Sequence, residues 1–114
     1  MRSKSEVIIA DLLHDLNVTY DYEVPFTGDD GRTVRPDFTI TTDIGETVLW
    51  EHLGMLGDPR YEAKWTQKRA WYAANGVLSP DEGGARRATL IVTDDRNGVD
   101  VQAWLDRARK VLGL

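Results

Sequence analysis

Two strand-like runs, residues 33–41 (TVRPDFTIT) and 46–53 (ETVLWEHL), are joined by a short turn and constrain the fold more than any other feature. Both are rich in β-branched and aromatic residues, and the glycine that ends the turn can adopt the positive φ of a tight hairpin. If the loop consists of residues 43–45, Asp37 lies directly opposite Glu51 and their side chains share one face. A four-residue loop would shift this pairing by one residue.

Two carboxylates that face each other across neighbouring strands repel, so this register favours a cation between Asp37 and Glu51. The chain has no cysteine, and its two histidines are His14 and His52. A thiolate or Cys/His zinc site is therefore excluded, and any metal must be held by oxygen ligands. Oxygen ligands are typical of Mg²⁺ or Mn²⁺ sites.

The other elements follow from hydrophobic periodicity and from start and stop signals. Ser3 and Glu6 have the capping-box spacing of a helix start, and Asp58 before Pro59 marks another. The expected order is αβββαβα. We expect helices over residues 3–16, 58–75 and 99–114, further strands over 18–26 and 88–94, and a loop over 77–87.

The length and composition of the chain indicate one globular domain over residues 1–114. No apolar run is long enough to span a bilayer and no secretory signal is evident, so we expect no membrane association and a cytoplasmic location. The net charge of −5 argues mildly against a free-standing nucleic-acid binder. The one locally positive segment is residues 64–72, KWTQKRAWY.

This positive segment belongs to the second expected helix, where Tyr61, Trp65, Lys68 and Tyr72 fall on one stripe. A lysine amid aromatic residues that face a sheet either extends out between the rings or points its ammonium at carboxylates on the sheet. Lys64, at the edge of the stripe, is the second candidate for that role.

Glu6 lies near the apolar stripe of the first helix. It either caps that helix or reaches the carboxylates of the hairpin. His52 should point to the opposite face of its strand from Glu51, as a buried, hydrogen-bonded side chain. Trp50, Trp65 and Trp71 are better explained by core packing than by base stacking.

The spaced set of Glu6, Pro36-Asp37, Glu51 and Lys68 on these elements resembles the PD-(D/E)XK, or restriction-endonuclease-like, nuclease superfamily. The chain is similar in particular to the nuclease-like domain attached to some superfamily I DNA helicases. The similarity covers nearly the whole chain and is carried by KSEVIIADLL, YDYEVPF, RPDFTI, WEHLGM, DPRYEAKWTQKRAWYAANG and LIVTDD. It implies an α/β fold with a mixed four-stranded sheet flanked by helices.

The resemblance also implies a metal site. Asp37, Glu51 and the backbone carbonyl of His52 would hold Mg²⁺ or Mn²⁺, and Glu6 would bind the metal directly or through water. This sequence departs from the family pattern Glu-x-Lys, because it has Leu53 at the position of the lysine. Lys68 from the following helix would replace it.

The implied activity is divalent-metal-dependent hydrolysis of DNA, with a helicase domain in cis or in trans, or a second copy of the chain, as partner. The rival interpretation is a catalytically inactive module that positions DNA or a helicase, and RNA is a further possible substrate. Candidate substrate contacts are Arg35, Lys64, Arg69 and Tyr72. For the three cations among them, a solvated surface charge is the alternative.

Overall fold

A computed structural model describes residues 3–82, 87–96 and 98–114. It contains three helices, α1 (Lys4–Asp15), α2 (Pro59–Ala74) and α3 (Val101–Leu112), among these residues. The strands in the same part of the chain are β1 (Tyr20–Tyr22), β2 (Phe26–Thr27), β3 (Thr33–Val34), β4 (Phe38–Thr41), β5 (Thr47–Leu53), β6 (Val77–Leu78) and β7 (Ala88–Asp94).

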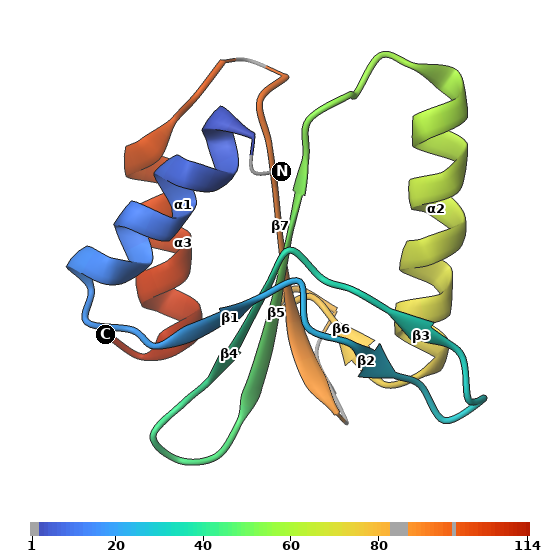
Figure 1. Cartoon of the computed structure of the whole chain (residues 1–114), viewed down its shortest axis with the longest axis horizontal. Coiled ribbons are helices and arrows are strands. Elements are labelled where there is room, and N and C mark those ends of the chain that lie inside the picture. Colours follow the sequence, from blue (N-terminus) through green and yellow to red (C-terminus); the bar gives the residue numbers. More distant parts are fainter. Residues whose placement is uncertain (1–2, 83–86, 97) are drawn as a thin grey trace.

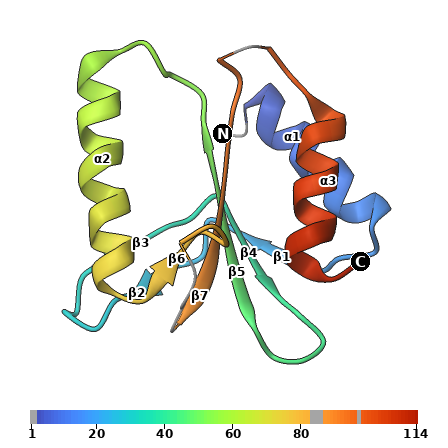
Figure 2. The ribbon, with the colours of Figure 1, turned by 180° about the vertical axis from the view of Figure 1, so that it is seen from behind.

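The main sheet is mixed, with the strand order β1-β4-β5-β7-β6. β4 runs antiparallel to β1 and β5, and β7 runs parallel to β5 and β6. The helices α1 and α3 cover one face of this sheet and α2 covers the other (Figures 1 and 2). The chain is therefore a mixed α/β domain, with a hydrophobic cluster on each face of the sheet.

The register of the central hairpin agrees with the three-residue loop. Phe38 pairs with Trp50 and Ile40 with Val48, and the backbone N–H of Thr42 donates to the carbonyl of Glu46 (2.8 Å). Gly45 has a φ of 83°, the left-handed conformation that glycine adopts without a steric penalty. The ladder ends one pair before Asp37 and Glu51, so these acids lie at the mouth of the hairpin's open end.

The three predicted helices are confirmed, and Ser3 and Asp58 cap the first two. Ser3 Oγ accepts a hydrogen bond from the backbone N–H of Glu6, and the Asp58 side chain accepts one from Arg60. Among the described residues, no helix combines the length and the hydropathy needed to cross a membrane.

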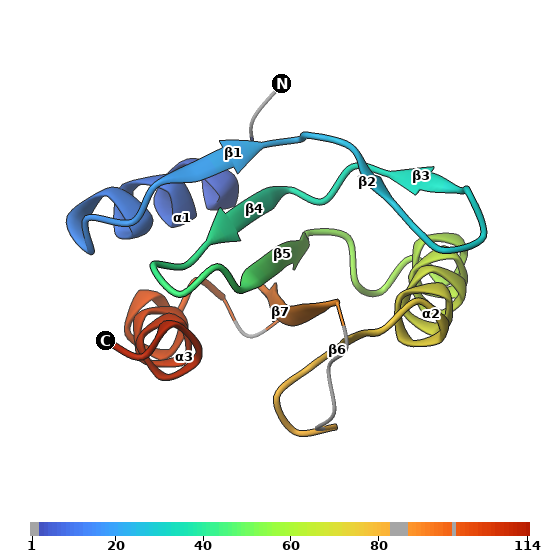
Figure 3. The same ribbon diagram turned by 90° about the horizontal axis from the view of Figure 1, so that it is seen from below.

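The strand predictions need three corrections. The run 33–41 does not form one strand, because it is divided into β3 and β4, which belong to different sheets. The run 18–26 does not form one strand, because Glu23 takes a positive φ of 54° and ends β1. β2 then pairs with β3 in a separate two-stranded sheet (Figure 3). The expected four-stranded sheet has five strands, because β6, predicted as loop, adds beside β7. Residues 83–86 of that predicted loop lie outside the described residues.

The β2–β3 hairpin is docked on the C-terminal part of α2. The backbone N–H of Asp29 donates to Asn75 Oδ1 (2.7 Å), and Trp71 Nε1 donates to Asp30 Oδ2 (2.8 Å). Gly28 permits this approach, since a Cβ there would lie 2.5 Å from the Trp71 ring. The hairpin leads directly into Arg35 and Asp37, so its docking determines where the candidate site begins.

We predict that Gly28→Ala lowers the free energy of unfolding by about 1–3 kcal/mol, because the added methyl group must push the Trp71 ring or Asn75 aside. Denaturant unfolding measures this difference. Gly54→Ala is the matched control, since a Cβ at Gly54 meets its nearest atom only at 4.0 Å. Equal stability of the two variants would contradict the close docking of the hairpin.

Candidate active site

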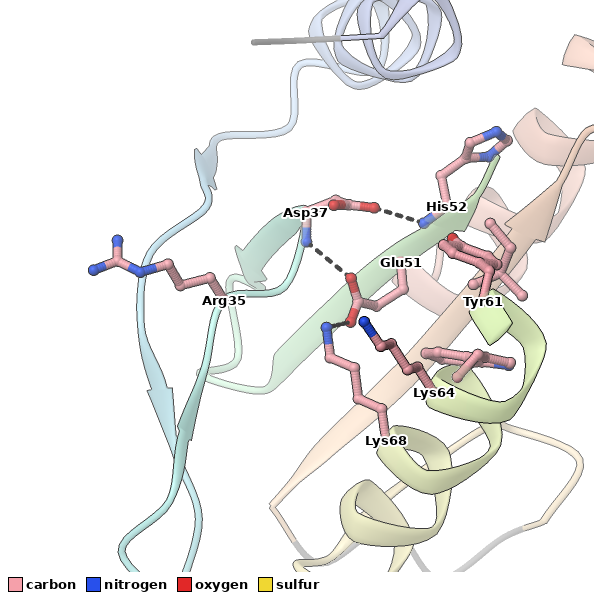
Figure 4. A pocket seen from close by; sticks show the side chains of 9 residues that line it. Arg35, Asp37, Glu51, His52, Tyr61, Lys64 and Lys68 are labelled. Atoms are coloured by element: carbon pink, nitrogen blue, oxygen red, sulfur yellow. Dashed lines mark hydrogen bonds and ion pairs between the residues drawn. The ribbon is translucent and has the colours of Figure 1, made fainter. Parts of the chain in front are cut away.

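Asp37 and Glu51 are brought together where β4 begins beside β5. The backbone N–H of His52 donates to Asp37 Oδ2 (2.7 Å), and the backbone N–H of Asp37 donates to Glu51 Oε1 (3.3 Å) (Figure 4). Each carboxylate therefore accepts a hydrogen bond from the backbone of the other strand. This exchange holds both acids in fixed positions although the strand ladder has ended.

Lys68 forms an ion pair with Oε2 of Glu51. The Glu51 side chain is 6% exposed and that of Lys68 29% exposed. The same Oε2 accepts a hydrogen bond from the Tyr72 hydroxyl (2.9 Å). Of the two orientations considered for Lys68, the structure has the ammonium on the carboxylate, which compensates a charge that burial would otherwise make costly.

Glu6 contributes to the field of this site from α1. Only the Ser3 half of the predicted capping box forms, and the Glu6 carboxylate accepts a hydrogen bond from the Tyr22 hydroxyl. Over the described residues, no three His, Asp or Glu side chains are grouped closely enough to hold one metal ion. Glu6 is thus near Asp37 without sharing a three-carboxylate cage with it.

Burial of Asp37 is the largest electrostatic effect at the site. Burial raises the pKa of Asp37 to about 7, against the lowering effect of the hydrogen bond from His52 N–H. The charges of Glu51 and Glu6 raise this pKa further, and the Lys68 ammonium lowers it. The field at Asp37 is therefore still negative despite Lys68, and a cation at this point would be stabilised.

A cavity of about 260 Å³ opens beside these residues. Lys64 and Lys68 reach into it side by side from α2 (Figure 4). Tyr61, to which the sequence assigned only a place in the aromatic stripe, lines the cavity too. Its position one turn before Trp65 is the sequence feature that could have indicated this. The full lining is Arg35, Asp37, Glu51, His52, Leu53, Tyr61, Lys64, Trp65 and Lys68.

The remaining candidate substrate contacts differ in how they lie relative to the cavity. The Arg35 guanidinium donates to the carbonyl of Glu23 (3.3 Å) and extends away from the carboxylates in Figure 4. Arg69 pairs with Glu82 (3.5 Å) and lines a different cavity. Tyr72 is fully buried. It therefore orients Glu51 through its hydroxyl and does not face solvent.

His52 points to the opposite face of the sheet from Glu51, as expected. Trp50 Nε1 donates to Thr93 Oγ1 (2.9 Å), which leaves the threonine hydroxyl proton for His52 Nδ1 (2.9 Å). The ring proton of a neutral His52 is then on Nε2, 3.8 Å from Asp95 Oδ2. Burial lowers the pKa of His52, with Asp95 opposing this effect, so the imidazole is neutral near pH 7.

We predict a pH-dependent gain in stability for Asp37→Asn. The raised pKa of Asp37 means that the folded protein keeps a proton that the unfolded chain releases above about pH 4. Wild-type stability therefore falls as pH rises from about 4 to about 7, and the asparagine variant escapes this loss. At pH 8 the variant should be more stable by about 1–2 kcal/mol, a value reduced by solvent screening at the partly open site.

Denaturant unfolding at pH 4, 6 and 8 measures this difference. Asp21→Asn, an exposed position on β1, controls for the loss of a carboxylate elsewhere. A stability difference for Asp37→Asn that stays constant from pH 4 to pH 8 would refute the raised pKa.

We also predict that Thr93→Val destabilises the protein by about 2–4 kcal/mol, because it leaves the Trp50 and His52 ring nitrogens buried without partners. Thr93→Ser keeps the hydroxyl and should cost clearly less. Thermal unfolding of the two variants makes the comparison, and equal losses would show that the methyl group, not the hydroxyl, is what matters at this position.

Comparison with known proteins adds little to this geometry. No known protein-family profile matches the chain. The chain is 34% identical over 77 residues to an uncharacterized protein of Methanocaldococcus jannaschii. The aligned part is 67% of this chain and 6% of that protein, so the chain spans only a small fraction of this relative's length.

Proposed function

We propose that this domain is a divalent-metal-dependent phosphodiesterase of the PD-(D/E)XK type that hydrolyses DNA. The observation that carries the proposal is the meeting of Asp37, Glu51 and Lys68 around one cavity. Two carboxylates and a lysine around the same cavity are the components that metal-assisted phosphodiester hydrolysis requires. The lysine comes from α2, which compensates for Leu53 at the usual lysine position.

The donor set suits Mg²⁺ or Mn²⁺. Asp37 uses Oδ2 for the His52 N–H, which leaves Oδ1 for another ligand, and the backbone carbonyl of His52 offers a further oxygen. Burial is the main cause of the raised pKa of Asp37, and the charges of Glu51 and Glu6 raise it further, so a cation bound beside these acids would stabilise the ionised carboxylate. A bound Mg²⁺ would supply Lewis-acid polarisation of the scissile phosphate and acidify a water molecule.

The chain's own residues would then perform the remaining tasks. The Lys68 ammonium lies at the Glu51 carboxylate, where it can orient the attacking water and stabilise the charge that develops on the phosphate. The Tyr72 hydroxyl holds Glu51 in place for this purpose. Lys64, exposed at the cavity, can bind a neighbouring phosphate.

DNA as substrate and a helicase as partner, in cis or in trans, are proposed from the family resemblance. A catalytically inactive DNA-positioning module is the second candidate. It is favoured by the ion pair itself, because the Lys68 ammonium occupies the Glu51 oxygen that a metal would use.

We predict that the protein cleaves linear, nicked or single-stranded DNA in the presence of Mg²⁺ or Mn²⁺. Asp37→Ala should lower the cleavage rate at least about 100-fold, because it removes a metal ligand, and Lys68→Met should lower it by a similar factor. Gel assays with labelled DNA measure the rates. Lys110→Met, at an exposed position on α3, is the matched control for loss of a positive charge.

The outcomes separate the candidates. Cleavage that survives Asp37→Ala unchanged would exclude this site as the active site. DNA binding without cleavage under any of these conditions would favour the inactive module.

A further inference from the structure

One wall of the cavity is aromatic. Tyr61 and Trp65 lie one turn apart on α2, are both half-buried, and line the same space as Asp37 and Glu51. Aromatic rings elsewhere pack against each other, as Phe38 does against Tyr20, Tyr22 and Trp50. Within residues 3–82, 87–96 and 98–114, neither Tyr61 nor Trp65 makes such a ring contact. Trp65 packs against the buried cluster that contains Leu49 and Tyr72, as predicted, and it also lines the cavity.

The indole N–H of Trp65 also differs from those of two other tryptophans, because they donate hydrogen bonds within the protein and it does not in the described part of the chain. Trp50 Nε1 donates to Thr93 and Trp71 Nε1 donates to Asp30. In the described part of the chain, Trp65 Nε1 has no hydrogen-bond acceptor. A half-buried tryptophan with an unused N–H at a cavity wall is suited to contact a ligand that has both a flat face and polar edges.

The rings alternate with cations along one side of α2. Tyr61 and Trp65 are interleaved with Lys64 and Lys68, and all four side chains line the cavity. Burial raises the pKa of Tyr61, and the backbone of Gly54, in the segment that follows β5, opposes this rise. Interleaved aromatic and basic side chains are typical of sites for single-stranded nucleic acid, where bases stack on rings and phosphates meet cations.

The geometry distinguishes an unpaired nucleotide from a duplex. In a duplex the faces of each base are covered by its neighbours, so no base face is free to contact a protein ring without unstacking. A phosphate at Asp37 and Glu51 would bring the attached nucleoside to the Tyr61–Trp65 wall, because both lie around one cavity of about 260 Å³. Only a nucleotide that is already unpaired can fill this space without that cost.

We infer that the cavity is a subsite for an unpaired nucleotide, whose base stacks on Tyr61 and Trp65 while an adjacent phosphate contacts Lys64. The substrate is accordingly single-stranded DNA, or a frayed or flapped end, in preference to intact duplex. The orientation of the nucleotide rests on the proposed function, which puts its phosphate at the carboxylates. The stacking wall itself does not depend on catalysis.

The test compares the binding of oligothymidylate with that of an abasic oligomer of the same length, with Ca²⁺ in place of Mg²⁺. Both oligomers carry the same charge, so the ratio of their dissociation constants isolates the contribution of the bases. Wild-type protein should bind oligothymidylate at least about 5-fold more tightly. Tyr61→Leu with Trp65→Leu should reduce this ratio to about one, whereas Tyr61→Phe with Trp65→Phe should retain most of it.

A ratio near one for the wild-type protein, or a ratio that the leucine variant leaves unchanged, overturns the inference. Photocrosslinking of a bromodeoxyuridine oligomer to the wild-type protein needs no substitution and serves if the leucine variant does not fold. The crosslink should map to Tyr61 or Trp65, and a crosslink confined to another surface also overturns the inference.

The two proposals fail separately. Loss of the base contribution in the leucine variant, without DNA cleavage by wild type, retains the nucleotide subsite and rejects the nuclease. Cleavage that requires Asp37, combined with equal binding of the two oligomers, retains the nuclease and rejects the stacking subsite.

Discussion

The burial of the Glu51 carboxylate is the constraint on which the arrangement of this domain depends. A carboxylate that is 6% exposed is costly unless charged and polar partners surround it. Here three groups from two parts of the chain are the partners: the Lys68 ammonium and the Tyr72 hydroxyl from α2, and the backbone N–H of Asp37 just before β4. The hydrogen bonds and the ion pair that compensate the Glu51 carboxylate therefore help to fix the positions of α2 and of the residues before β4 relative to β5.

The same solution leaves Asp37 undercompensated. Burial is the main cause that raises the pKa of Asp37 to about 7; the hydrogen bond from the His52 N–H lowers it, and Lys68, which pairs with Glu51, lowers it less. A structure built only for stability would gain from an uncharged residue at this position. Retaining a partly buried acid beside a second acid is the kind of local cost that accompanies a binding or catalytic site.

Sequence reasoning succeeded where a local pattern left at most two outcomes, one of which the structure has. The hairpin register followed from the loop length, the helix starts followed from Ser3 and Asp58, and the stripe on α2 turned Lys68 toward the sheet. It failed where the deciding contact was distant. The positive φ of Glu23 accompanies a backbone hydrogen bond from its N–H to the carbonyl of Asp37, and β6 exists as a strand only because β7 lies beside it. No pattern within residues 18–26 or 77–87 reports those contacts.

The sequence by itself determined the three helices and the starts of the first two, narrowed the hairpin register to two choices, and limited a metal to oxygen ligands, because each depends on periodicity, loop length or residue type alone. The tertiary structure decided which cation meets which acid, that Tyr72 is buried as a support for Glu51, and that Arg69 lies apart from the site. It also decided that Tyr61 and Trp65 share a cavity with the carboxylates. These outcomes depend on how α2 packs against the sheet and on the cost of burying one charge. Residues far apart in the chain compensate that charge together.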